Sequence, residues 1–145
     1  MTKVQTVTGA IDVAAMGVTL THEHILNDVL SWWHPPFDDS PRSRALVDEK
    51  VSMENLWELR NDPFANKDNC TMNDRALAIR ELHRFVAQGG QTVIETSADG
   101  NGRDPEGLVE VSRATGLNII MGTGYYLDAS QPAENDAKSE RQIAD

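Results

Sequence analysis

Cysteine is almost absent from this sequence, because Cys70 is the only one in 145 residues. A single thiol forms no internal disulfide and cannot supply a zinc site built from several cysteines. Long hydrophobic runs are also missing near the start of the chain, where the apolar stretch 13–18 covers six residues and is too short for a signal peptide or a membrane span. These absences favour a cytoplasmic protein with no membrane partner.

Positive charge is also scarce. Lysine and arginine total 13 against 23 acidic residues, which gives a net charge of −10. Nucleic acids and anionic membranes are bound largely through lysine and arginine, so this charge argues against both partners. The apolar fraction of 39% still provides for a core, and the length is that of about one domain of roughly 150 residues.

Strand and helix patterns alternate along the chain. Three segments rich in β-branched and apolar residues predict strands, namely 17–25, 91–96 and 117–124. Helical spacing of apolar residues predicts a helix over 73–88. Asp104, Pro105 and Gly116 predict the N-cap, the first position and the end of another helix, and 139–145 has the pattern of a further helix start. This order predicts an α/β fold with right-handed parallel crossovers.

Three parallel strands make a small sheet, which would leave both of its edges open to pairing. A (β/α)8 barrel needs about 250 residues. We therefore predict that residues 1–145 form a single partial domain, the N-terminal segment of a TIM barrel with about three β/α units.

A long connection, 27–73, follows the first predicted strand. Within it we expect a helix over about 43–60 that ends before Pro63. A connection of this length in a compact domain indicates a functional insertion. Its aromatic residues Trp32 and Trp33 either line a substrate pocket or anchor the loop.

Two histidines, His22 and His24, stand at the end of the first predicted strand. Side chains at i and i+2 of a strand point the same way from Cα atoms about 6.6 Å apart, whereas on a helix they diverge by about 200°. Both imidazoles can therefore reach one metal ion at the carboxyl end of the strand. The alternative is a pair of ordinary histidines, satisfied within the fold or exposed. Strict alternation also places Val18 and Leu20 on the histidines' face and Glu23 on the opposite face, toward the helices.

Four blocks of sequence together resemble a known family: TVTGAI (6–11), GVTLTHEH (17–24), ETSADGNGRD (95–104) and GTGYY (122–126). In this order and spacing they resemble the phosphotriesterase family of the amidohydrolase superfamily, and the likeness runs through nearly the whole chain. The resemblance implies a (β/α)8 barrel with two divalent metal ions, usually Zn²⁺, bridged by hydroxide. It also implies that His22 and His24 bind the more buried ion and that Tyr126 lines the substrate pocket.

The remaining ligands of that family come from later strands and are not located in residues 1–145. They are a bridging carboxylated Lys or a Glu, then two His and an Asp that accepts a proton, and all are expected beyond Asp145. Lys138 lies in a polar stretch rather than at a strand end, so it is not assigned as the bridge. The 145-residue chain alone is therefore expected to lack a complete metal site and to be inactive.

The activity that the resemblance implies is zinc-dependent hydrolysis of an ester-type bond. The small-molecule substrate would be a lactone, a phosphotriester or a carboxylic ester, other divalent metals could replace zinc, and a homodimer is expected by analogy with relatives. The alternative is a non-catalytic barrel homologue or binding module that has lost the later ligands. The residues after Asp145 would discriminate between the two.

Other polar motifs have structural interpretations. The stretch 100–104, GNGRD, lacks the third glycine of GxGxxG because Pro105 stands in its place, so a capped turn is expected rather than a phosphate cradle. His83 falls outside the apolar stripe of its helix and is expected at the surface. Cys70 is expected to be a packed, unreactive thiol, and His34 is not expected to be a third metal ligand.

Overall fold

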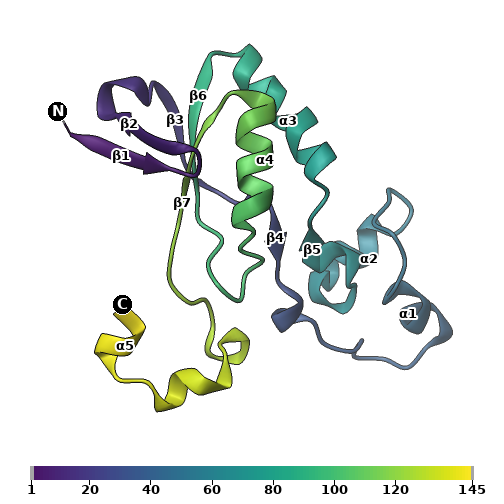
Figure 1. Ribbon diagram of the computed structural model, residues 1–145. Coiled ribbons are helices and arrows are strands. Elements are labelled where there is room, and N and C mark those ends of the chain that lie inside the picture. Colours follow the sequence, from purple (N-terminus) through teal and green to yellow (C-terminus); the bar gives the residue numbers. More distant parts are fainter. Residues whose placement is uncertain (1, 145) are drawn as a thin grey trace.

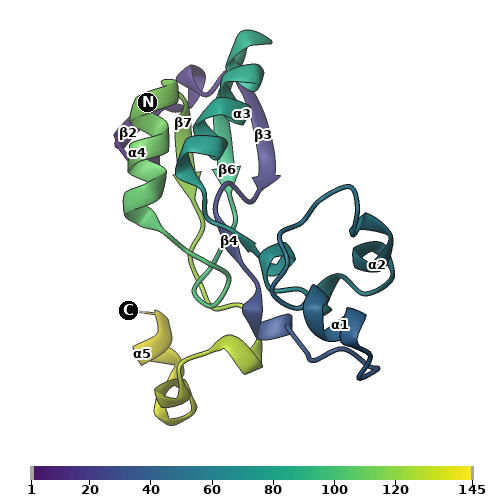
Figure 2. The same ribbon diagram turned by 90° about the vertical axis from the view of Figure 1, so that its right-hand side faces the viewer.

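The computed structural model describes residues 2–144, and its centre is a three-stranded parallel sheet. The strands lie in the order β3 (Val18–Glu23), β6 (Gly90–Glu95) and β7 (Asn118–Met121). Helices α3 (Arg75–Ala87) and α4 (Pro105–Thr115) lie together against one face of this sheet (Figure 1; Figure 2). Parallel strands joined through helices confirm the predicted α/β class.

Several smaller elements surround this sheet: β1 (Lys3–Thr6), β2 (Gly9–Asp12), β4 (Asn27–Asp28), α1 (Pro41–Leu46), α2 (Leu56–Asn61), β5 (Thr71–Met72) and α5 (Glu140–Ala144). β1 and β2 form an antiparallel hairpin, and β4 pairs with β5, although the sequence pattern predicts neither pair. The β4–β5 pair joins the two ends of the long insertion. α5 lies within the helix predicted over 139–145, of which Asp145 is outside the described residues. No helix in the described part of the chain has the length and apolarity needed to cross a membrane.

The hydrophobic core lies between the sheet and the two helices. Val93 of β6 and Ile119 of β7 are paired in register, and both are fully buried. Leu108 and Val111 of α4 are also fully buried. The partly buried side chains that α3 adds to this cluster are Ala78, Ile79, Leu82, Phe85 and Val86. Full burial of one such aliphatic side chain contributes about 1.5–3 kcal/mol, so this cluster is the main source of stability for the sheet.

Helix α4 begins and ends as the sequence predicts. The carboxylate of Asp104 accepts a hydrogen bond from the backbone N–H of Gly107 at 2.9 Å, and Pro105 occupies the first helical position. Gly116 follows the helix with a φ of +76°, which residues with a Cβ rarely adopt. Arg75 of α3 donates to the Asp104 carboxylate at 2.6 Å, so the cap also joins the two helices.

Strand β3 departs from strict alternation, which corrects one prediction. Leu20 pairs with Val93, which belongs to the core between the sheet and the helices, so Leu20 faces the helices. Leu20 also lines a cavity of about 200 Å³ together with Glu23, His24 and Leu77. A register shift between Leu20 and Glu23 inserts one extra residue into β3. The prediction that Leu20 shares a face with His22 is therefore wrong, whereas the prediction that Glu23 faces the helices is confirmed. Because of the extra residue, Glu23 faces the helices, whereas Thr19 and Thr21, which alternate with Leu20, do not.

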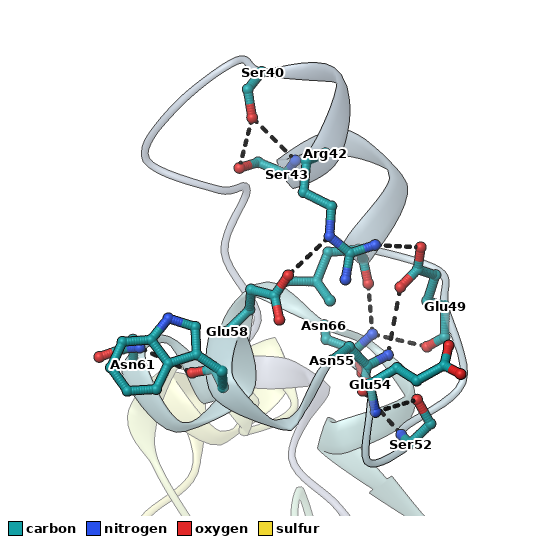
Figure 3. Close-up of polar contacts among 12 residues, drawn as sticks. Ser40, Arg42, Ser43, Glu49, Ser52, Glu54, Asn55, Glu58, Asn61 and Asn66 are labelled. Carbon is teal, nitrogen blue, oxygen red and sulfur yellow. Dashed lines mark hydrogen bonds and ion pairs between the residues drawn. The ribbon is translucent and has the colours of Figure 1, made fainter.

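The prediction of a single helix over 43–60 is wrong, because the chain forms two short helices in this region instead. α1 ends at Leu46 and α2 begins at Leu56. The fully buried Asn66 donates through its side-chain nitrogen to the carbonyl oxygens of both Leu46 and Glu49 (Figure 3). These bonds satisfy carbonyl groups that the next helical turn would otherwise have used, so the chain turns away after Leu46.

Polar contacts also fix the turn between α1 and α2. Asn55 accepts a hydrogen bond from the backbone N–H of Ser52 at 2.9 Å and donates to the Lys50 carbonyl at 2.8 Å. Arg42 spans the turn, donating to Glu49 at 2.7 Å and to Glu58 at 2.8 Å (Figure 3). The insertion also buries Leu46, Leu59, Ala65 and Cys70, and side-chain hydrogen bonds and ion pairs fix the turn between its two helices.

Candidate functional site

The candidate site lies at the carboxyl end of β3. His22 belongs to the strand, and His24 follows its last residue. The two imidazole rings lie edge to face, with centroids 5.7 Å apart and an angle of 76° between their planes. Figure 2 shows that β3 and β6 end at the same side of the molecule, where the chain continues into β4 and the insertion. The two rings therefore lie close together at the end of a strand, as predicted.

A buried serine contacts His24. The ring nitrogen Nδ1 of His24 lies 2.9 Å from Oγ of Ser97, which is 1% exposed and follows β6 by two residues. The Ser97 hydroxyl also lies 2.6 Å from Glu95 Oε1 and 2.9 Å from the carbonyl oxygen of Leu26. Glu95 is likewise 1% exposed, and both of its carboxylate oxygens accept from the Ser97 backbone N–H at 3.2 Å. One hydroxyl thus connects the ends of β3 and β6.

Backbone hydrogen bonds make this edge of the sheet rigid. Thr96 N–H donates to the Glu23 carbonyl at 2.9 Å, and Gly122 N–H donates to the Glu95 carbonyl at 2.7 Å. Gly122 suits this position, because a Cβ there would lie 3.2 Å from that same carbonyl oxygen. The ends of β3, β6 and β7 are therefore joined directly behind the histidine pair.

Ser97 and Glu95 are functional candidates that the sequence analysis missed. A signal was available, because both belong to the block ETSADGNGRD at the end of a predicted strand adjacent to the one that carries the histidines. Carboxyl ends of parallel strands meet at one edge of a sheet, so polar residues there are expected to approach the histidines. What the sequence could not supply was the pairing of β3 with β6.

The aromatic candidates stand apart from the histidine pair. Trp32 stacks on Phe64 with ring centroids 5.4 Å apart, and Trp33 lies under the Lys67 ammonium group at 5.4 Å. Both contacts lie within the insertion. Tyr126 is partly exposed after β7, where its backbone N–H donates to the Asp99 carbonyl at 3.0 Å. The placement of Trp32 and Trp33 suits the loop-anchoring alternative, and a role for all three in a substrate pocket stays a prediction.

Other polar residues take structural positions. His34 Nε2 lies 3.3 Å from Asp62 within the insertion, away from the candidate pair. Lys138 donates to Asn135 at 2.8 Å in the segment before α5. His83 is exposed on α3, as predicted. Cys70 is 1% exposed, and burial raises the pKa of its thiol, which agrees with the predicted packed, unreactive cysteine.

The turn 100–104 also has a structural explanation. Gly102 has a φ of +78°, and a Cβ there would lie 2.3 Å from the backbone nitrogen of Asp28 in β4. The glycine therefore lets the turn lie directly on β4. Arg103 and Asp99 form an ion pair at 3.8 Å, and Asp104 caps α4. The capped turn that the sequence predicts is confirmed.

The donor set at the candidate site fits a divalent metal only in part. Two imidazoles are suitable zinc ligands, and a hydrogen bond on Nδ1 leaves Nε2 of His24 available for an ion. Within residues 2–144, however, no group of three or more His, Cys, Asp or Glu side chains could hold a metal ion. The described residues thus offer two adjacent ligands rather than a closed site.

A parallel sheet covered by helices on one face, with two histidines where its first strand ends, defines an α/β protein whose candidate site lies at its strand ends. A model of the phosphotriesterase family matches residues 2–145. The chain belongs to the phosphotriesterase family, as the four sequence blocks suggest.

Similar proteins extend well beyond this chain. N-acetyltaurine hydrolase of Bos taurus is 37% identical over 144 residues, which are 99% of this chain and 40% of that protein. Phosphotriesterase-related protein of Nematostella vectensis is 38% identical over 132 residues, which are 90% of this chain and 37% of that protein. A resiniferatoxin-binding protein from Rhodobacter sphaeroides, of known crystal structure, is 42% identical with a TM-score of 0.91, over 98% of this chain and 39% of that one.

The chain therefore spans about 40% of the length of the curated relatives that it matches. The solved relatives are phosphotriesterase-like TIM barrels. The sheet β3–β6–β7 with α3 and α4 thus has the fold of part of a (β/α)8 barrel, which confirms the predicted fold class.

Proposed function

We propose that this protein is a metal-dependent hydrolase in which His22 and His24 bind one of two divalent metal ions, with zinc as the expected metal. The observation that carries the proposal is the pair of adjacent imidazoles at the end of β3, one of them held through Nδ1 by Ser97. A metal ion in such a site activates a water molecule and polarises the bond to be cleaved.

The described residues have three tasks in this proposal. His22 and His24 hold the ion, and the ends of β6 and β7 keep β3 in place behind them. Ser97 fixes the orientation of the His24 ring. Further ligands are expected from residues beyond Asp145, namely a bridging carboxylated Lys or a Glu, two His and an Asp. No catalytic residue other than the two metal ligands is assigned within this chain.

The substrate proposed in the first place carries an ester-type bond, as a lactone, a phosphotriester or a carboxylic ester does. A second candidate is an amide, which is favoured because relatives 35–37% identical are named N-acetyltaurine hydrolase. Both reactions begin with attack of water on a polarised carbonyl or phosphoryl group, so the same metal ligands serve either. A panel of these substrates, assayed with zinc, would discriminate between the two.

The alternative from another class is binding without turnover. It has one observation in its favour, since a solved relative 42% identical to this chain is named as a resiniferatoxin-binding protein. A barrel that lacks the later ligands would bind a small molecule and release it unchanged. The metal content of the whole protein would discriminate between the hydrolase and the binding module, because a binding module of this kind has no need of two metal ions.

Partners and location follow from the same proposal. A small-molecule substrate is proposed, with neither nucleic acid nor membrane as partner, since the net charge of −10 disfavours both. We also propose a cytoplasmic location and a homodimer. Size-exclusion chromatography with light scattering would test the dimer.

Three single substitutions in the whole protein test the proposed metal site. His22→Ala and His24→Ala are expected to remove bound metal and abolish turnover, because each removes a ligand. His83→Ala, on the exposed face of α3, is expected to change neither. Metal content by mass spectrometry and turnover of the substrate panel provide the readouts. Equal and mild effects of all three substitutions would show that the strand pair consists of ordinary histidines.

A further inference from the structure

The hydroxyl of Ser97 contacts more hydrogen-bond acceptors than it can serve. A serine hydroxyl carries one hydrogen and can accept further hydrogen bonds through its lone pairs. Three groups surround this oxygen: Nδ1 of His24 at 2.9 Å, Oε1 of Glu95 at 2.6 Å and the carbonyl oxygen of Leu26 at 2.9 Å. The Leu26 carbonyl can only accept, and the Glu95 carboxylate accepts at the shortest distance.

The single hydroxyl hydrogen is therefore committed to Glu95 or to Leu26. Should Glu95 carry a proton, it would donate to Ser97, and the hydroxyl hydrogen would go to Leu26 instead. In either arrangement the hydroxyl hydrogen is already used, so the 2.9 Å contact with His24 is a hydrogen bond only if Nδ1 of His24 donates to Ser97. A neutral imidazole carries one N–H, so a hydrogen on Nδ1 leaves Nε2 with a free lone pair.

We infer that Ser97, held in place by Glu95, is a positioning residue that keeps His24 in the Nδ1–H tautomer and so leaves Nε2 free to bind a metal ion. The metal-binding part of this inference rests on the proposed function, whereas the tautomer does not. The contact between Ser97 and His24 is strengthened by burial, because Ser97 and Glu95 are each 1% exposed and water cannot replace either partner. In metal sites, such a hydrogen bond to the second ring nitrogen fixes both the tautomer and the ring orientation.

The same contacts explain why Ser97 and Glu95 act as a unit. Glu95 accepts the Ser97 backbone N–H through both carboxylate oxygens as well as facing its hydroxyl, so the serine is fixed at two atoms. The Ser97 hydroxyl also contacts the Leu26 carbonyl oxygen, and this contact fixes the position of the chain just after His24. The ring of His24 is consequently held by a residue whose own position is fixed from both strands.

Nuclear magnetic resonance of the whole protein, labelled with ¹⁵N-histidine and freed of metal, tests the tautomer. At mildly alkaline pH, where imidazoles are neutral, two-bond ¹H–¹⁵N correlations show which ring nitrogen carries the hydrogen. His24 is expected to carry it on Nδ1. A hydrogen on Nε2 of His24 in the unmodified protein would overturn the inference, whatever any variant does.

Two variants separate positioning from general stability. Ser97→Ala removes the acceptor for Nδ1, so His24 is expected to shift toward the Nε2–H tautomer, whereas Ser97→Thr keeps a hydroxyl and is expected to retain Nδ1–H. Ser112→Ala is the matched control, because Ser112 is also a buried serine and donates to the Leu117 carbonyl at 2.7 Å, within the α4–β7 connection. Equal changes of the His24 spectrum in Ser97→Ala and Ser112→Ala would overturn the inference.

Zinc titration of the whole protein then tests the consequence for metal binding. Ser97→Ala is expected to weaken zinc binding by about 10- to 100-fold, and Ser112→Ala to leave it unchanged. Unchanged affinity in Ser97→Ala would overturn the claim that the serine prepares His24 for a metal ion. Should the unmodified protein show the Nδ1–H tautomer and yet bind no zinc, the proposed function fails while the positioning of His24 by Ser97 is supported.

Discussion

The sheet with its two helices and the insertion between β4 and β5 are stabilised by different kinds of interaction. The sheet region buries Val93, Leu108 and Ile119 completely, and its helices are capped by Asp74 and by Asp104, the second as the sequence predicts. The insertion exposes large apolar side chains, such as Met53 at 85% and Trp57 at 76%, and its helices have six residues each. The insertion buries fewer apolar side chains, namely Leu46, Leu59, Ala65 and Cys70, and none of them belongs to the core cluster of the sheet, so polar side chains bonded to backbone groups contribute more to its stability.

This difference shows where the candidate site gets its rigidity. His22, His24, Glu95 and Ser97 all belong to the ends of strands in the sheet region. The core cluster that supports these strands contains no residue of the insertion 27–73. We therefore expect changes in the insertion to leave the histidine pair in place.

The largest effect is expected from a cavity in the core. Leu108→Ala should lower the free energy of unfolding by about 2–5 kcal/mol, because it removes a fully buried side chain that the surroundings cannot replace. Leu59→Ala is the matched change in the insertion, because Leu59 is 3% exposed, and it should cost less, since Leu59 lies outside the core cluster of the sheet. Urea denaturation followed by circular dichroism provides the measurement. Similar costs for the two substitutions would contradict the division into an apolar and a polar region.

In the insertion, the largest effect is expected at Asn66. Asn66→Ala should cost about 1–3 kcal/mol, because it removes the side-chain donor to the carbonyls of Leu46 and Glu49 and the acceptor of the Asn69 N–H. Hydrogen exchange should accelerate in the insertion and stay unchanged in β6. Asn61→Ala is the control, since Asn61 is exposed and bonds only to the nearby Trp57 carbonyl. Faster exchange throughout the sheet would show that the two regions unfold together.

The N-cap Asp104 adds a test that depends on pH. The Gly107 amide is the main reason that the pKa of Asp104 lies below its ordinary value, burial opposes this, and Arg75 lowers it further. A carboxyl group whose pKa is lowered by folding stabilises the protein above its ordinary titration range, and this stability is lost as pH falls through the lower folded pKa. Asp104→Asn should therefore cost about 1 kcal/mol at neutral pH and nothing in acid.

Unfolding curves between neutral and acidic pH measure this difference. Asp39→Asn is the matched control in the insertion, because the Asp39 side chain is 92% exposed and its ion pair with Arg44 lies at the surface. That substitution should leave the pH profile unchanged. A constant difference between Asp104→Asn and the unmodified protein at every pH would show that its carboxylate makes no charge-dependent contribution.

The contrast between the regions also explains which elements the sequence predicts. α3 and α4 follow from helical spacing, caps and terminal glycines, all of which are local signals. The break between α1 and α2 depends on Asn66, which is 20 residues from Leu46 in sequence, and no local pattern contains that contact. The apolar residues of 43–60 have helical spacing, yet several of them remain exposed, so periodicity alone was misleading there.

For the site, local pattern predicted the histidine pair but not its support. His22 and His24 follow from residue type, spacing and position at a strand end. Ser97 and Glu95 depend on the pairing of β3 with β6, and the face of Leu20 depends on a register shift within that pair. Neither of these is encoded within a short stretch of sequence, since each requires two strands about 70 residues apart. Long-range pairing is therefore what the sequence analysis lacked in both regions.

The smallest effect is expected from the charged network in Figure 3. Arg42 is about half exposed. Its bond to Glu58 lowers the pKa of that carboxyl group, and its bonds to Glu58 and Glu49 raise the pKa of the guanidinium group. Exposed pairs contribute little to stability and are screened by salt, so Arg42→Met should lower the free energy of unfolding only slightly, and less still at high ionic strength.

Arg84→Met on α3 is the control for this substitution, since it removes one exposed pair with Glu81 from the apolar region. Denaturation at low and at high salt measures both. If Arg42→Met cost as much as Asn66→Ala, the insertion would depend on its surface charges. A small, salt-sensitive cost for Arg42→Met beside a large, salt-insensitive one for Asn66→Ala would instead place its stability in the buried amide, because hydrogen bonds shielded from solvent are screened little by ions.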